Sequence, residues 1–128
     1  MAIQAVRGAI QVAQDDPAEI RDATRELISQ VLAENDLHAD ALISISFTMT
    51  PDLVSEFPAL AAHEAGLVDV PMMCAVEINV PGAMPRVIRM MALVYTDLPR
   101  TALKHSYLRG AAGTRPDVVV SARRSPST

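Results

Sequence analysis

The sequence predicts one domain of the α/β (α+β) class: a single mixed five-stranded sheet with one long helix and short helical turns. Its 128 residues leave little room for a second domain. Five segments have the alternating or β-branched pattern of strands, whereas only one long segment repeats its apolar residues at helical spacing. One helix and several turns among five strands favour a mixed sheet over regular βαβ repetition.

The long helix is predicted from Pro17 to about Asn35, after a strand over residues 2–12. Asp16 is a candidate N-cap, proline suits the first helical position, and Glu19 stands where a capping-box carboxylate belongs. The residues that recur at helical spacing are Ile20, Thr24, Leu27, Ile28, Val31 and Leu32.

The remaining strands are predicted from alternation and from their turn residues. Gly8 in the first strand marks a bend or a close approach of backbone. Ile43, Ile45, Phe47 and Met49 alternate with polar side chains, which indicates a half-buried strand. The four further strands are residues 41–49, 71–80, 86–95 and 103–108.

Two short helices are predicted between the strands. Residues 50–52 and 57–59 each place a proline at a candidate helix start, and Gly66 is placed to end the second helix. Residues 121–128 are polar and contain a proline, so we expect them to form a flexible C-terminal tail. The folded domain is therefore predicted over residues 1–120.

Composition excludes several classes of partner. The net charge is −4, and the chain lacks a basic face with aromatic platforms, so no nucleic-acid partner is expected. No apolar run approaches the ~20 residues of a membrane span, and the N-terminus lacks the pattern of a signal peptide. One cysteine, Cys74, excludes an internal disulfide and suits a reducing compartment. We expect a cytoplasmic protein.

The balance of apolar residues predicts an oligomer. Half of the residues are apolar and 20% are charged, while only 3% are aromatic. A chain of 13.7 kDa buries about two-thirds of its unfolded surface. Part of its apolar surface is therefore expected to be closed by partner subunits.

Charged residues stand inside three of the predicted strands. Arg89 shares a face with bulky apolar residues, Glu77 stands in the middle of 71–80, and Arg7 lies in the first strand. Because desolvation costs several kcal/mol per ion, such residues are rarely buried without a partner. One interpretation is that Arg89 and Glu77 pair across adjacent strands or lie on a solvated face.

The other interpretation is a site for an anionic ligand. Together with Arg115, the sequence offers three such arginines but only one matching carboxylate. Guanidinium groups bind carboxylates and phosphates well. The chain has no Gly-rich phosphate loop, nucleophile elbow or CxxC motif, and its three histidines are isolated in sequence. No metal or cofactor is predicted.

A series of short motifs runs along the chain in a fixed order. The motifs are Val6-Arg7-Gly8-Ala9, Thr50-Pro51-Asp52-Leu53, Phe57-Pro58-Ala59, Val70-Pro71 through Cys74 and Glu77, Ile88-Arg89, Thr96-Asp97, His105, Tyr107-Leu108 and Arg115-Pro116-Asp117. In order and spacing, from about residue 3 to 117, the chain resembles the monofunctional trimeric chorismate mutases of the α/β class.

The resemblance implies a pseudo-barrel homotrimer with active sites between subunits. Its implied activity is the rearrangement of chorismate to prephenate in the shikimate pathway to phenylalanine and tyrosine. This reaction needs no nucleophile, proton transfer or cofactor. Negative charge grows on the ether oxygen as the C–O bond breaks, so a fixed cation and a held reactive conformer accelerate it.

The resemblance also implies roles for individual residues. Arg89 would face the ether oxygen and Arg7 a substrate carboxylate, while Glu77 and Cys74 would meet the ring hydroxyl and Tyr107 a carboxylate. Met73 and Ala75 would line the same segment as Cys74. The apolar walls from a neighbouring subunit and the steering charge at the mouth would be Phe57, Ala59, Thr114 and Arg115. The alternatives without a role in binding are that Tyr107 is a strand aromatic, Phe57 a core residue and Arg115 a solvated tail residue.

The chain departs from the family pattern beside this site. Leu60 and His63 stand where the family commonly carries basic residues, which predicts a raised KM with a smaller effect on kcat. Met72 and Met73 replace smaller residues, so the pocket lining is expected to differ. Two other functions stay open: an enamine/imine deaminase-like enzyme on a similar trimeric scaffold, and a non-catalytic trimeric module that binds a dicarboxylate.

Overall fold

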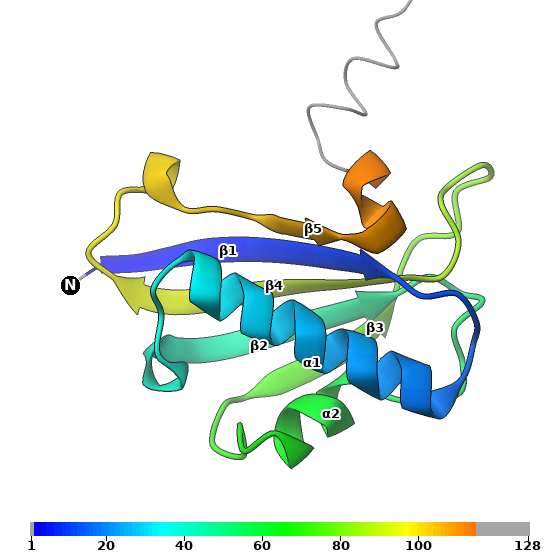
Figure 1. The fold of residues 1–128 in the computed structure, drawn as a ribbon, viewed down its shortest axis with the longest axis horizontal. Coiled ribbons are helices and arrows are strands. Elements are labelled where there is room, and N and C mark those ends of the chain that lie inside the picture. The colour runs from blue at the N-terminus through cyan, green and yellow to red at the C-terminus, as the bar shows by residue number, and fades with distance from the viewer. Residues whose placement is uncertain (1, 115–128) are drawn as a thin grey trace, which may run out of the picture.

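The computed structural model describes residues 2–114. The predicted tail over 121–128 and Arg115 lie outside the described residues. Figure 1 shows a twisted sheet with two helices on one face. The elements are β1 (Ala2–Gln11), α1 (Pro17–Glu34), η1 (Ala39–Ala41), β2 (Leu42–Met49), α2 (Pro58–Glu64), β3 (Met72–Val76), β4 (Val87–Thr96), η2 (Arg100–Ala102), β5 (Ser106–Leu108) and η3 (Arg109–Thr114).

The five strands form one mixed sheet in the order β3-β2-β4-β1-β5. β4 is the central strand and runs antiparallel to both β1 and β2, while β3 is parallel to β2 and β5 is parallel to β1. The predicted mixed five-stranded sheet is therefore confirmed. No described helix is long and apolar enough to cross a membrane.

The long helix forms where its apolar spacing predicts it. Asp16 is the N-cap, its Oδ2 accepts the Glu19 N–H at 3.0 Å, and Pro17 occupies the first turn. The Glu19 carboxylate accepts the N–H of Ala13, while the Asp16 N–H donates to Gln14 O. The predicted reciprocal capping box is therefore wrong in its second half, because the preceding loop supplies a different donor.

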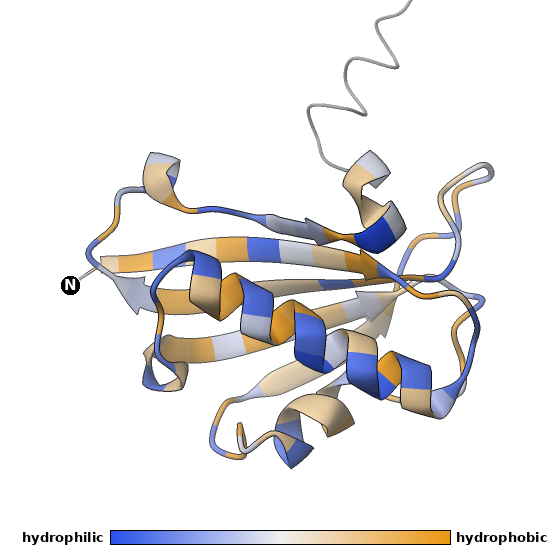
Figure 2. Ribbon diagram, in the orientation of Figure 1, coloured by the Kyte–Doolittle hydropathy of each residue, from blue (hydrophilic) through white to orange (hydrophobic). Residues whose placement is uncertain are grey.

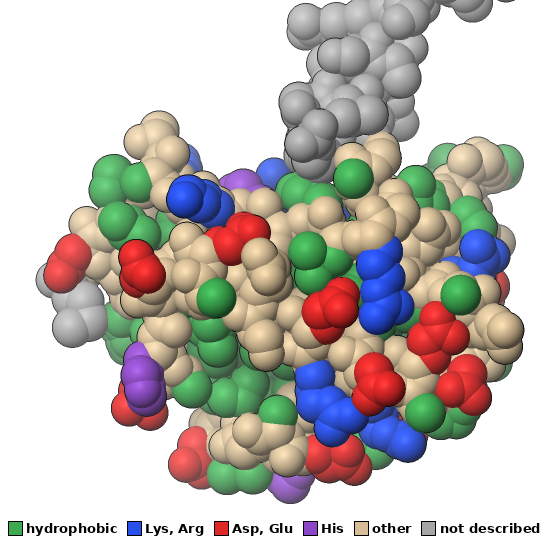
Figure 3. Space-filling model, in the orientation of Figure 1, with side chains coloured by type: hydrophobic (Ala, Val, Ile, Leu, Met, Phe, Trp, Pro, Cys, Tyr) green, Lys and Arg blue, Asp and Glu red, His purple; other side chains and the backbone are tan. Residues whose placement is uncertain are grey.

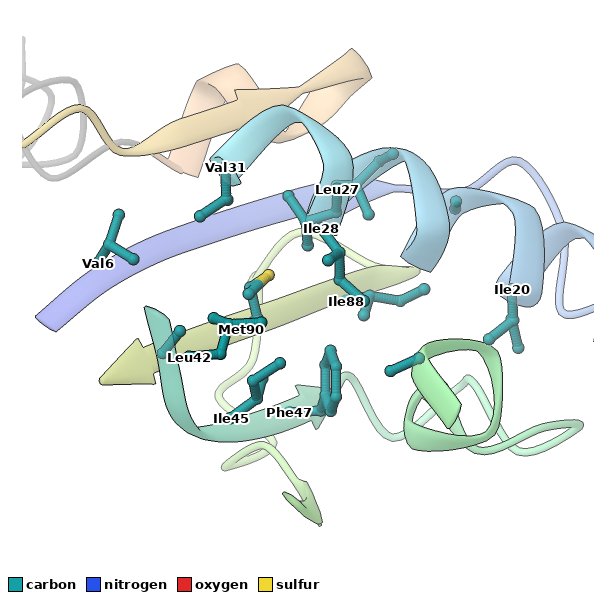
Figure 4. Packing of buried hydrophobic residues seen from close by; sticks show 14 of the residues in the cluster. Val6, Ile20, Leu27, Ile28, Val31, Leu42, Ile45, Phe47, Ile88 and Met90 are labelled. Carbon is teal, nitrogen blue, oxygen red and sulfur yellow. The ribbon is translucent and has the colours of Figure 1, made fainter. Parts of the chain in front are cut away.

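The core lies between the helices and one face of the sheet, as Figure 4 shows. Figure 2 shows hydrophobic and hydrophilic residues alternating around α1, and Figure 3 shows acidic and basic side chains on the outside of this layer. Leu27 and Val31 of α1 lie so close to Gly8 of β1 that an added Cβ would be 2.8 Å and 3.0 Å from their side chains. The close backbone approach predicted at Gly8 is confirmed.

Three boundaries differ from the prediction for physical reasons. Residues 50–52 form a turn instead of a helix, since the Thr50 and Asp52 side chains accept backbone N–H groups from residues 86–87. β3 ends at Val76 because β2, its only partner, ends at Met49. β5 starts at Ser106 because the Asn35 side chain bonds both the N–H and the carbonyl of residue 104.

The second short helix is confirmed. α2 starts with Pro58 at its first position and runs to Glu64. Gly66 follows with a φ of 101°, a conformation that glycine adopts without steric cost. Its N–H donates to His63 O at 3.0 Å and so ends the helix.

The other face of the sheet, which we call the open face, carries exposed apolar side chains. Ile3 of β1 is 58% exposed, and Met91, Leu93 and Tyr95 of β4 are 40% to 47% exposed. At one end of this face η3 covers Ala9. A monomer with such a face is expected to associate, as the composition predicts.

We predict that Gly8→Ala lowers the free energy of unfolding by about 1–3 kcal/mol, because the new methyl group overpacks the contact with Leu27. Urea titration measures this effect. The matched background is Leu27→Val, which removes the δ-methyl groups that meet the new Cβ. An equal cost of Gly8→Ala in both backgrounds would contradict the proposed clash.

Candidate functional site

The sheet register places several of the predicted site residues in one row across the open face. Arg89 of β4 lies opposite Ala9 of β1 and opposite Thr48 of β2. Ala9 in turn lies opposite Tyr107 of β5, and Thr48 lies opposite Ala75 of β3. Paired residues share a face, so the five side chains form a continuous row. Ala9, between Arg89 and Tyr107, is buried under Ala111 of η3.

An ion pair joins Arg89 to Glu77. Arg89 Nε lies 2.7 Å from Glu77 Oε1, and both side chains are partly buried. Thr48 Oγ1 donates to the same carboxylate oxygen at 2.8 Å, and the Glu77 N–H donates to Met49 O at 2.9 Å. The expected pairing of Arg89 with Glu77 is confirmed. The expectation that it joins adjacent strands is wrong, because Glu77 follows β3 and β2 lies between β3 and β4.

This geometry keeps part of the Arg89 guanidinium for another partner. The ion pair uses Nε, which leaves the two terminal nitrogens outside it. Arginine stays protonated and presents its donors in a rigid plane. A guanidinium anchored on one edge by Glu77 and Thr48 is a preorganised cation.

Arg7 is the diagonal neighbour of Arg89 on the same face. It lies opposite Met91, two residues along β4 from Arg89, and its side chain is exposed. Diagonal neighbours of this kind are roughly 7–8 Å apart at Cα, so long side chains from both can reach one ligand. Arg7 therefore lies on the same face as the Arg89–Glu77 pair, on the neighbouring strand.

His105 is a residue of this site that the sequence predicted only as a family motif without a role. Its Nδ1 accepts the backbone N–H of Arg7 at 3.0 Å, just before β5 begins to pair with β1. Partial desolvation of the ring, followed by the positive charge of Arg7, lowers the pKa of His105 below its usual 6.5. The neutral imidazole thus extends the hydrogen bonding of β1 to Arg7.

A cleft of about 950 Å³ is lined by Arg89, the middle residue of this row, and by Glu77. It lies between the 78–85 loop and η3, whose Thr114 lines it. Ligand pockets span roughly 300–1,000 Å³, so the cleft has room for a small molecule. Arg86 also lines it and adds a cation that the sequence analysis did not single out.

A second hollow of about 890 Å³ lies at the other end of β4. Asp36, Asp40 and Asp97 line it, and His38 is its only basic lining residue. Its charge repels an anion, so the cleft at Arg89 is the candidate site. No group of three or more His, Cys, Asp or Glu side chains that could hold a metal occurs within residues 2–114.

The other predicted residues lie around this centre at different distances. Phe57 is 68% exposed at the start of α2, so its interpretation as a core residue is wrong. Neither Phe57 nor Ala59 lines the cleft of its own chain.

Met73 shares the face of Ala75, whereas the register pairs Cys74 with Phe47, whose side chain is in the core. The Cys74 thiol is thus on the other face from Glu77, at the exposed edge of the sheet.

Comparison with known proteins gives consistent matches over nearly the whole chain. A profile of the family described as chorismate mutase type I matches residues 3–118. Chorismate mutase AroH of Thermus thermophilus is 45% identical over 117 residues, which cover 91% of this chain and 96% of that protein. Chorismate mutase AroH of Bacillus subtilis (strain 168) is 35% identical over 119 residues, covering 92% and 94%. The solved chorismate mutase from Clostridium thermocellum is 41% identical, with a TM-score of 0.84 over 85% of this chain and 97% of that one.

The His105 contact predicts a pH dependence of stability. As the pH falls through 6.5, the unfolded chain takes up a proton that the folded His105 resists, so the free energy of unfolding falls until the lower folded pKa is passed. His105→Asn keeps an acceptor but does not titrate. We expect urea unfolding at pH 7.5 and 5.5 to show a smaller loss for this variant than for the wild type. Equal losses in the two proteins would contradict the prediction, since the two chains differ only at residue 105.

Proposed function

The chain belongs to the chorismate mutase type I family and is a chorismate mutase, an isomerase that converts chorismate to prephenate; on this premise we propose that Arg89 is its electrostatic catalyst. The observation that carries the proposal is the Arg89–Glu77 pair at 2.7 Å, within a cleft on the open face. This activity serves the pathway to the aromatic amino acids.

The chemistry assigns Arg89 its role. The rearrangement is intramolecular, and negative charge grows on the ether oxygen as the C–O bond breaks. A cation that is already fixed stabilises this charge without reorganisation in the transition state. Glu77 and Thr48 hold the Nε edge, and the terminal nitrogens supply donors to the ether oxygen and a nearby carboxylate.

The remaining charges fit a dianionic substrate. Arg7 binds one substrate carboxylate from the neighbouring strand, and Tyr107 contacts a carboxylate from the far end of the row. Glu77 accepts from the ring hydroxyl, whereas the Cys74 side chain, which the resemblance also assigned to this hydroxyl, lies on the other face of the sheet and does not reach it. Two arginines and one glutamate give the reacting centre a net positive charge, which favours a compact dianion.

We also propose a homotrimer in which each cleft is completed by a neighbouring subunit. The exposed apolar side chains of the open face support this, as do the exposed Phe57 and Leu60 beside α2. Phe57 and Ala59 of the neighbour then form apolar walls, Thr114 lines the cleft of its own chain, and Arg115 is a steering charge at the mouth. A single exposed Cys74 supports a cytoplasmic location, since such a thiol suits a reducing compartment.

The family match does not favour the two rival functions. The family model that matches residues 3–118 is that of chorismate mutase type I, and the relatives reported above are chorismate mutases that match at 35% to 45% identity. A non-catalytic dicarboxylate-binding module would bind chorismate without producing prephenate. The direct test follows the absorbance of chorismate with purified protein and checks that prephenate appears.

We predict that Arg89→Lys lowers kcat by roughly 10²–10³-fold, or about 3–4 kcal/mol, because all donors of lysine lie on one nitrogen, which cannot pair with Glu77 and also replace the terminal nitrogens of Arg89 at the ether oxygen. Chorismate turnover measures kcat, and circular dichroism checks folding. Arg25→Lys, an exposed arginine paired only to Asp22 in the same helix, is the matched control. Near-normal turnover by Arg89→Lys would refute the mechanism.

We predict that Leu60→Lys combined with His63→Arg lowers KM and leaves kcat nearly unchanged. Both residues are exposed on α2, outside the cleft of their own chain, so the added cations act on the cleft of a neighbour. The KM of this variant should also rise more steeply with salt than that of the wild type. His38→Arg adds a cation at the other end of the sheet and is the control. A monomeric mass in sedimentation equilibrium, or a KM equal to the control's, would contradict the intersubunit site.

A further inference from the structure

Arg86 has a strained backbone at the entrance to the central strand. Its φ is 56°, in the left-handed region that side chains other than glycine seldom adopt. Such a conformation is energetically unfavourable and persists only where the surrounding contacts hold it. Arg86 is also the last residue before β4, three positions before Arg89, and it lines the same cleft.

Hydrogen bonds from two other segments hold Arg86 in this conformation. Its N–H donates to Asp52 Oδ2 at 3.0 Å and lies 3.3 Å from Oδ1. Its carbonyl accepts the Val12 N–H at 2.9 Å, and its Nε donates to Val12 O at 3.0 Å. Gln11 Nε2 donates to the carbonyl of Pro85 at 3.0 Å. The Asp52 carboxylate is the only charged group among these partners.

The turn that contains Asp52 also holds the next residue of β4. Thr50 Oγ1 accepts the Val87 N–H at 3.0 Å, and the Thr50 N–H donates to Val87 O at 3.1 Å. One residue earlier, Met49 O accepts the Glu77 N–H. Residues 49–52 therefore bond the chain just before Arg89 and the chain at Glu77, which form the catalytic ion pair.

The negative charge of Asp52 strengthens its hydrogen bond to the Arg86 backbone. Burial acts to raise its pKa, but hydrogen bonds from Thr50 and from the Arg86 backbone, with the Arg86 charge, lower the pKa below 3.8 overall. The carboxylate is thus ionised at neutral pH. A charged acceptor bonds a backbone N–H more strongly than a neutral one.

We propose that Asp52 is a positioning residue for catalysis: its carboxylate holds the left-handed backbone of Arg86 and thereby places Arg89 against Glu77. The inference rests on the proposed role of Arg89. Asp52 does not line the cleft that contains Arg89 but an adjoining hollow that shares Glu77 with it, and its printed hydrogen bond towards Arg89 is to the backbone of Arg86. A displacement of about 1 Å at a catalytic group costs up to about 100-fold in rate.

The test is a double-mutant cycle between Asp52→Ala and Arg86→Gly. We expect Asp52→Ala to lower kcat by about 10- to 100-fold with little change in KM. Glycine adopts a φ of 56° readily, so in the Arg86→Gly background the further loss from Asp52→Ala should fall to within about threefold. If Asp52→Ala does not fold, the same cycle with Asp52→Asn, which keeps one acceptor oxygen without charge, replaces it.

Asp15→Ala is the matched control, because the Asp15 carboxylate accepts the Val54 and Ser55 N–H groups of the same loop at 3.1 Å each but has no bond to β4. We expect it to keep the wild-type kcat. An equal loss of kcat in the control, an unchanged kcat in the Asp52 variant, or an undiminished loss in the Arg86→Gly background would each overturn the proposal. Failure of the proposed function itself is separate, since it would appear as near-normal turnover by Arg89→Lys.

Discussion

The pairing of the central strand β4 with both of its neighbours is the constraint on which the rest of the structure depends. Ile88, Met90, Ala92 and Val94 face the helices and are buried, while the residues between them face the open side. A slip of one residue in register would exchange the two sets and bury Arg89. Packing of the core thus determines on which face of the sheet Arg89 lies.

The same register explains why the ion pair spans three strands. Thr48 of β2 lies between Arg89 and the strand that leads to Glu77, and its hydroxyl donates to the carboxylate oxygen that also pairs with the guanidinium. A larger residue at this position would block the pair. Ala9 and Ala75 continue the row with side chains that are equally small. The site is therefore shaped as much by the short residues of the row as by the charged ones.

The sequence predicts the parts of this arrangement that follow from local periodicity. Alternation in β4 gives the face of Arg89, and helical spacing gives the buried side of α1. The pattern does not reveal that Asn35 bonds residue 104 and so sets the start of β5, or that His105 accepts the N–H of Arg7. These contacts join residues far apart in the chain. The motif at residues 50–53 was visible as a family feature, but its partners at residues 86–87 were not.

The two ends of the open face differ in character: one end carries a charged cleft, and the other carries exposed apolar side chains. At one end η3 and the 78–85 loop rise beside Arg89 and leave a cleft, whereas towards the end of β4 the same face carries Leu93 and Tyr95 without cover from the described residues. In the proposed trimer, burial of the apolar end brings a neighbour's α2 region towards the charged end. Assembly then supplies the hydrophobic free energy that the small core lacks and also the missing wall of the site. On this proposal, substrate capture depends on residues that reach across the interface, such as those at positions 60 and 63, while the chemical step depends on groups within one sheet. The two can therefore vary independently, which explains how the reacting centre can remain intact while the neighbouring cations are absent.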